Sequence, residues 1–148
     1  MTIKRTHKSY QKNWLKKNSH LKILDLGCTH VNYWKEANHF ADIVDYSNEF
    51  KEKNLNFTLL APNEKLPFKD KEFDFVIASH VLEHVEDPPF FLNEIQRISS
   101  KGGYIEVPTK LEDNLVFENK KDHLWHIDFD DDENKLLISK KKIILNLY

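Results

Sequence analysis

Residues 64–88 read EKLPFKDKEFDFVIASHVLEHVEDP, and this stretch decides how the rest of the chain is interpreted. A turn-rich connector leads into FDFVIASHV, whose nearly continuous apolar run from Phe75 to Ala78 is typical of a strand buried in a parallel sheet. Ser79 and His80 follow at the expected carboxyl end of that strand. Residues 80–84 also fit H-x-x-E-H, the pattern of inverted zinc metalloproteases. Whether they form a strand end or a metal site depends on the neighbouring segments.

The rest of the chain alternates short apolar segments with helical or turn-rich ones. Residues 6–20 and 88–100 have apolar side chains at helical spacing, and residues 31–40 are compatible with a short helix. Further strands are expected in four segments: LKILDLGC at 21–28, ADIVDYS at 41–47, NFTLLA at 56–61 and KGGYIEVP at 101–108. Residues 124–130 and 135–141 flank an acidic turn and predict an antiparallel hairpin. This order predicts an α/β fold with a mostly parallel, doubly wound sheet.

The composition excludes several classes of function. The 148 residues carry a formal net charge of -2, which gives no general attraction to nucleic acid or to an anionic membrane. The N-terminus has no apolar signal region, and no apolar run is long enough to cross a bilayer. Cys28 is the only cysteine, so an internal disulfide is impossible and a cytoplasmic location is expected. With three glycines in the whole chain, a nicotinamide dehydrogenase is disfavoured because G-x-G-x-x-G is absent.

The residues at the expected carboxyl ends of the strands are the candidates for a binding site, because open α/β sheets bind their ligands there. In strand order they are Asp25, Gly27 and Cys28; Asp45; Asn63 and Glu64; Ser79 and His80; and Pro108 with Thr109. Acids after the first two strands suit a ligand that has an amino group and a ribose, because a carboxylate accepts hydrogen bonds from both ribose hydroxyls. The sequence therefore predicts a nucleoside-containing ligand at this edge.

The segments ILDLGC, ADIVDYS, GGYIEVP and the stretch at 64–88 resemble the successive motifs of class I S-adenosylmethionine-dependent methyltransferases. The resemblance is to the small-molecule, methyltransferase type 11-like branch and covers roughly residues 20–140. It implies a Rossmann-like sheet of about seven strands with an antiparallel C-terminal hairpin. It also implies a single domain over 1–148, with an N-terminal helix at 1–20, a cofactor-binding core at 21–109 and a hairpin region at 110–148.

The resemblance implies S-adenosylmethionine as the cofactor, and it implies roles by position. Asp25 and Gly27 would lie beside the methionine part, Cys28 would belong to the same cofactor site, and Asp45 would hold the ribose hydroxyls. The adenine would lie against Asn63 and Glu64, while Ser79 and His80 would line the floor where cofactor and acceptor meet.

In this family the H-x-x-E-H stretch opens a helix after the fourth strand, so we expect no metal site and no stoichiometric zinc uptake. An inverted zinc protease would also need a further carboxylate ligand well downstream and a large peptide chamber. Glu83 is expected in the first turn of that helix, and His84 is expected to pack against the sheet.

Two loops depart from the family pattern. The family's first loop has glycine where this chain has Thr29 and Val31, and those side chains restrict how closely the backbone approaches a ligand. In the adenine loop the family often has D-A-E where this chain has Pro62, Asn63 and Glu64, so the expected acid is missing, although Asn63 could still offer its amide to adenine. These departures leave an alternative open: a catalytically inactive methyltransferase-fold module that serves as a binding or regulatory partner.

If the chain is active, we expect methyl transfer to a small-molecule or sugar-like acceptor by direct displacement. His80 and His126 are the candidate catalytic residues on the acceptor side. Apolar and polar residues alternate around His126, and a half-buried strand without any catalytic role would also explain this pattern. No nucleic acid and no membrane is expected as a partner, and a homodimer or a partner protein is compatible with the sequence.

Overall fold

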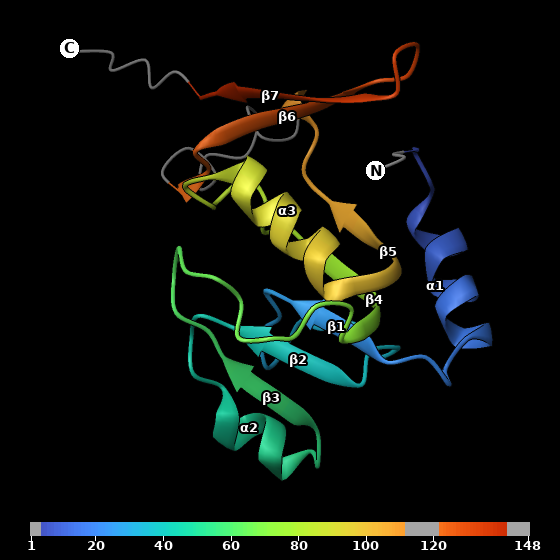
Figure 1. The fold of residues 1–148 in the computed structure, drawn as a ribbon, viewed down its shortest axis with the longest axis vertical. Helices are drawn as coiled ribbons and strands as arrows, with labels where there is room; N and C mark the ends of the chain where they lie inside the picture. Colours follow the sequence, from blue (N-terminus) through green and yellow to red (C-terminus); the bar gives the residue numbers. More distant parts are fainter. Residues whose placement is uncertain (1–3, 112–121, 142–148) are drawn as a thin grey trace.

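The computed structural model describes residues 4–111 and 122–141. Three helices and seven strands follow one another along the chain (Figure 1). They are α1 (Lys8–Lys17), β1 (Ile23–Leu26), β2 (His39–Asp42), α2 (Ser47–Glu52), β3 (Asn56–Leu59), β4 (Phe73–Ser79), α3 (Pro88–Ile98), β5 (Ser99–Glu106), β6 (Trp125–Asp130) and β7 (Lys135–Lys140). None of the helices in these described ranges is long and apolar enough to cross a membrane.

Five strands form one parallel sheet in the order β3-β2-β1-β4-β5, while β6 and β7 pair with each other as an antiparallel hairpin. Strand β1 is central and all four of its residues are buried, as its apolar sequence predicts. The strand order reverses between β1 and β4, where Leu24 pairs with Val76, and such a switch point is where open α/β sheets bind ligands. The predicted α/β Rossmann-like fold of about seven strands is confirmed, with the hairpin as a separate two-stranded sheet.

Each face of the five-stranded sheet is covered by its own apolar cluster. One cluster combines Leu15 of α1 and Phe50 of α2 with Trp34 from the β1–β2 connection. The other lies beneath α3 and includes Ile95 together with Phe68 from the connector before β4. The sheet is therefore covered on both sides, and its polar strand ends are left at the carboxyl edge.

A network around Arg97 of α3 fixes the connector that leads into β4. The guanidinium pairs with both oxygens of Glu94, at 2.7 Å from Nε to Oε1 and 2.7 Å from Nη2 to Oε2. It also donates to the backbone carbonyls of Phe68 at 2.7 Å and Leu66 at 3.0 Å. One part-buried ion pair thus holds the connector before β4 against the sheet.

Two local expectations are wrong. The connection from β1 to β2 forms turns and not a short helix, because the buried carboxylate of Asp25 holds the Trp34 backbone N–H at 2.7 Å. Strand β2 ends at Asp42 and not at Asp45, because Asp42 Oδ1 accepts from the N–H of Val44 at 2.7 Å and turns the chain out of the sheet.

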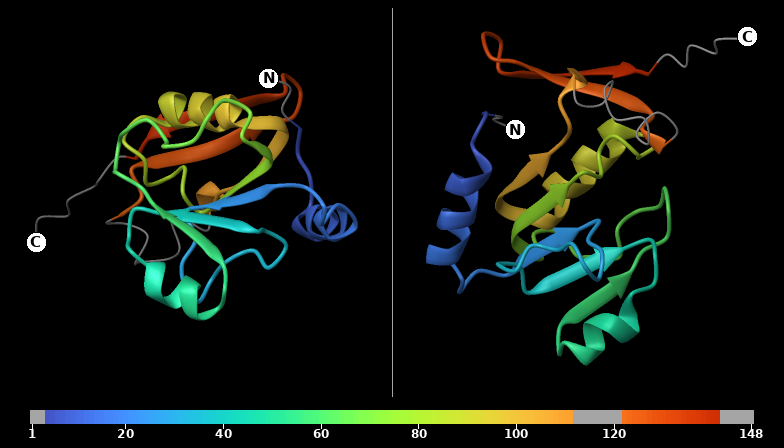
Figure 2. Two further views of the ribbon diagram at one scale, coloured as in Figure 1. Left: turned by 60° about the horizontal axis from the view of Figure 1, so that its bottom comes forward. Right: turned by 180° about the vertical axis from the view of Figure 1, so that it is seen from behind.

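The β6–β7 hairpin lies beyond the carboxyl edge of the sheet, beside the segment that follows β4 (Figure 2). The Leu124 N–H donates to the Glu83 carbonyl at 2.8 Å. Trp125 Nε1 donates to the carbonyl of Val85, also at 2.8 Å. The hairpin is thereby fixed next to the strand ends that the sequence identified.

Candidate active site at the carboxyl edge

Asp25 is the most perturbed acid at this edge. Its side chain is 2% exposed, and burial raises its pKa to about 7, helped by the charge of Asp42 and opposed by the hydrogen bond from Trp34. A buried carboxyl with this pKa changes charge near neutral pH. It is therefore suited to respond to a positive group placed against it.

The raised pKa of Asp25 predicts a pH dependence of stability. The folded protein holds this proton more tightly than the unfolded chain, so the contribution is full below pH 4 and is lost as the pH rises through 7. We expect urea unfolding to show a loss of about 2 kcal/mol between pH 5 and pH 7 from this group. Asp25→Asn, whose amide oxygen can still accept from Trp34, should lack that loss, and an unchanged pH profile in the variant would contradict the assignment.

Gly27 forms a tight turn directly after β1. Its φ is +82°, its N–H donates to the Ala41 carbonyl at 2.8 Å, and a Cβ placed on it would lie 2.2 Å from Cγ2 of Val81. Only glycine fits here, because the backbone is left-handed and a neighbouring side chain fills the space. Cys28 is buried behind this turn, and burial raises the pKa of its thiol to about 12, so this side chain packs in the core and presents no reactive thiolate.

Asp45, Asn63 and Glu64 are exposed in the loops that follow β2 and β3. Asp45 Oδ1 accepts from the Ser47 N–H at 2.9 Å, and hydrogen bonds from Ser47 lower the pKa of this carboxyl, so it is ionised at neutral pH. Asn63 has a φ of +58°, a conformation that asparagine tolerates better than most residues. These loops leave three polar side chains exposed after the strands β2 and β3.

A cluster around Glu106 was missed by the sequence analysis. Glu106 ends β5 and accepts from Ser79 Oγ at 2.6 Å and from Lys8 Nζ at 2.9 and 2.7 Å. Partial burial raises the pKa of Glu106, but the bonds from Lys8 and Ser79 outweigh it and lower the pKa below its usual value. Position at a strand end could have identified Glu106, whereas no local pattern points to Lys8, which is 98 residues away.

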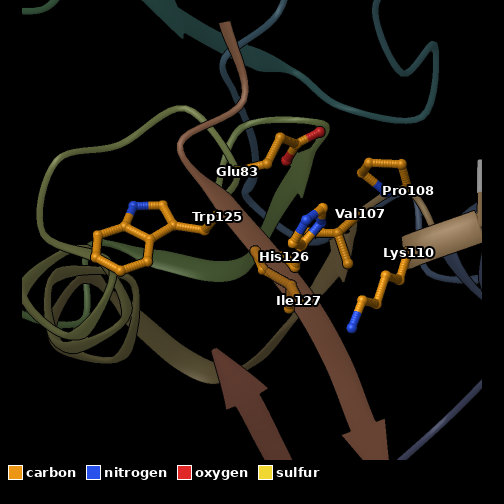
Figure 3. A pocket seen from close by; sticks show the side chains of 7 residues that line it. All are labelled: Glu83, Val107, Pro108, Lys110, Trp125, His126 and Ile127. Atoms are coloured by element: carbon orange, nitrogen blue, oxygen red, sulfur yellow. The ribbon is translucent and has the colours of Figure 1, made fainter. Parts of the chain in front are cut away.

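His80 follows Ser79 and has a φ of +57°. Its Nδ1 lies 3.4 Å from Glu83 Oε1, and this contact raises its pKa against the opposing effect of burial. Glu83 and His126 line one small pocket together with Lys110 and Trp125 (Figure 3). Glu83 therefore contacts His80 and shares a pocket with His126. It belongs to a turn before α3, so the expectation that it lies in the first turn of that helix is wrong.

A family model described as "Methyltransferase domain" matches residues 24–107, which is more than half of the chain. The chain belongs to the methyltransferase-domain family. The match spans β1 to the end of β5, so it includes every strand of the parallel sheet. This methyltransferase domain is thus the part of the chain that carries the polar strand ends.

Curated and solved relatives are similar to this methyltransferase domain. The uncharacterized protein MJ1123 of Methanocaldococcus jannaschii is 37% identical over 84 residues, which cover 53% of this chain and 41% of that protein. The chain therefore spans less than half of this relative's length. A chain from the complex between the Haloferax volcanii Trm112 methyltransferase activator and a methyltransferase matches with a TM-score of 0.51 and 17% identity, covering 81% of this chain and 72% of its own. The trans-methyltransferase CalH, solved with SAH, matches with a TM-score of 0.52 and 19% identity over 71% of this chain and 37% of its own.

Family membership supports S-adenosylmethionine, the cofactor that the sequence predicted. The polar groups at the carboxyl edge of the sheet are compatible with this cofactor. Asp45 is exposed and ionised, as hydrogen bonds to ribose hydroxyls require. Gly27 itself adds no side chain to its turn, and the atoms nearest to the position of a Cβ on it belong to Val81. Asp25 lies behind that turn with one oxygen already bonded to Trp34.

Proposed function

We propose that this methyltransferase domain transfers a methyl group from S-adenosylmethionine to a small-molecule acceptor by direct displacement. The observation that carries the proposal is a pair of acids, Asp25 in the central strand β1 and Asp45 in the loop after the neighbouring strand β2, within the segment that matches the family model. When bound, the cofactor would supply an electrophilic methyl group on a sulfonium. The protein would have to hold the acceptor in line with that methyl group and exclude water.

The residues divide into a cofactor side and an acceptor side. Asp45 would accept hydrogen bonds from the ribose, with Asn63 and Glu64 along the adenine. The turn at Gly27, with Asp25 behind it, would lie along the methionine part.

On the acceptor side, Glu106 offers an ionised carboxylate that is held by Lys8 and Ser79. Such a group can accept a hydrogen bond from a hydroxyl or an amine of the acceptor. His80 lies directly after Ser79 and is a candidate for contacting the acceptor from the same strand end, and His126 is a candidate from the hairpin.

The binding test uses titration calorimetry of the full chain with S-adenosylmethionine and with its demethylated product. We expect both to bind, and we expect Asp45→Ala to weaken binding at least tenfold because a charged acceptor of two hydrogen bonds is lost. Asp45→Ser should weaken binding as well, although serine can keep the bond to the Ser47 N–H. Asp128→Ala, which removes an exposed aspartate from β6, is the control and should bind like the unchanged protein.

A second candidate function is a non-catalytic module of the same fold that binds a partner. It is favoured by two contacts within the chain at residues assigned to the cofactor: Val81 lies against Gly27, and Asp25 already accepts a hydrogen bond from the Trp34 N–H. No binding of either ligand at millimolar concentration would reject the enzyme and favour this module. Unchanged affinity in both Asp45 variants would reject the ribose assignment alone.

A further inference from the structure

Three side chains of metal-ligand type meet where the hairpin touches the β4–α3 turn. Glu83 and His84 belong to that turn, and His123 comes shortly before β6. Each of the three residues offers one atom that could bind a metal ion, and these three atoms all lie within 4.8 Å of one another. Because His123 is distant in sequence, only the fold brings this set together.

The backbone around the three residues is fixed from both sides. Leu124 follows His123 directly and donates its N–H to the Glu83 carbonyl, while its own carbonyl accepts from the Lys141 N–H at 3.0 Å. The indole of Trp125 is bonded to the carbonyl of Val85. The cluster therefore rests on hydrogen-bonded segments and not on free loops.

Glu83 has the environment of a carboxylate that needs a cation. Its side chain is 1% exposed, and neither of its oxygens accepts a hydrogen bond within the described part of the chain. His80 Nδ1 approaches one oxygen at 3.4 Å. A buried carboxylate with so little compensation is costly unless it is paired or coordinates a metal ion.

His84 is oriented as metal-binding histidines are. Its Nδ1 lies 2.9 Å from the carbonyl oxygen of Asp122 and donates to it, which places the ring proton on Nδ1 and leaves a lone pair on Nε2. Metal-ligating histidines usually donate their other ring N–H to a carbonyl or a carboxylate in this way. The rings of His84 and His123 are nearly perpendicular, with centroids 4.6 Å apart.

We propose that Glu83, His84 and His123 bind one divalent transition-metal ion, with zinc as the preferred ion. Two imidazoles and a carboxylate are ligands that zinc accepts, and a water molecule would complete a tetrahedron. Ligands about 2.0–2.1 Å from zinc lie about 3.4 Å from one another, so binding would draw the donor atoms together by roughly 1 Å. The ion would link the hairpin to the turn after β4.

This site is not the H-x-x-E-H site considered from the sequence. His80 is not one of the three ligands, and His123 lies outside the motif. The proposal therefore replaces the expectation that this stretch binds no metal. It concerns a metal that holds two segments together and does not depend on S-adenosylmethionine binding.

The test measures zinc binding to the full chain, prepared without a histidine tag, treated with a chelator and dialysed against micromolar zinc. We expect one zinc per chain and a rise in melting temperature on adding zinc. His84→Ala and His123→Ala should each lower zinc affinity at least tenfold. His20→Ala, which removes an exposed histidine after α1, is the matched control and should bind zinc normally.

Two further measurements keep the result interpretable. His123→Gln removes the imidazole with a smaller change in polarity, and circular dichroism shows whether the variant is folded. Cobalt added to the unchanged protein should give the visible absorption of a four-coordinate site. Less than 0.2 zinc per chain, or uptake that is equal in the His84, His123 and His20 variants, would overturn the proposal whatever the result with the methyl donor.

Discussion

Replacing Arg97 by alanine is expected to lower the free energy of unfolding by about 3–5 kcal/mol. The substitution leaves the Glu94 carboxylate, whose side chain is 9% exposed, without its bidentate partner. It also removes the donors to the carbonyls of Leu66 and Phe68, which hold the connector before β4. The exposed partner Asp70 contributes little, because an ion pair in water is weak.

Urea unfolding followed by circular dichroism measures this effect. Arg97→Lys is the matched variant: it keeps the charge but cannot reproduce the planar two-pronged contact, so we expect it to lose a smaller part of the stability. Glu94→Gln in the Arg97→Ala background should recover part of the loss, because a neutral amide is easier to bury than an unpaired carboxylate. A loss below about 1 kcal/mol in Arg97→Ala would mean that the connector does not depend on this network.

Gly27→Ala is the second large effect, and it should impair both folding and cofactor binding. At φ +82° a β-carbon is strained by about 1–2 kcal/mol, and the new methyl group would lie 2.2 Å from Cγ2 of Val81. Relieving that overlap costs a further 1–3 kcal/mol or so in a packed site. We expect a total loss of about 3 kcal/mol and no measurable binding of S-adenosylmethionine, because the turn that would lie along the ligand must move.

A double substitution separates the two causes. Val81→Ala in the Gly27→Ala background removes the atoms that would collide, so stability should recover by roughly the overpacking part while the backbone strain remains. Val81→Ala alone is the control for the loss of the valine side chain. If the double variant is no more stable than Gly27→Ala, the overlap with Val81 is not the reason for the glycine.

The fold could be predicted because its signals are local. The run from Phe75 to Ala78 is apolar over its whole length, and a central parallel strand needs no other property. Helix α3 begins at Pro88, as the helical spacing over residues 88–100 predicts, and the structure shows that Asp87 caps it by accepting from the Phe90 N–H at 2.9 Å.

The rest of the site could not be predicted because it depends on distant contacts. The segment around Trp34 has helix-compatible residues, but Asp25 binds its backbone and buries the indole in the core. Asp45 and His80 were identified from motifs, whereas Glu106 needs Lys8 and Glu83 needs the hairpin to acquire their surroundings. Residue type and spacing located the strand ends, and tertiary packing determined what each polar group contacts.

The ion pair between Lys8 and Glu106 also has a consequence for synthesis on the ribosome. Helix α1 is made early, but Glu106 follows Lys8 by 98 residues, which takes roughly 5–20 s at ordinary translation rates. During that interval Leu15, which is fully buried in the finished protein, lacks the complete sheet that it packs against. The nascent chain thus carries a largely polar helix whose buried face, with Leu15, stays uncovered until the rest of the fold has been made.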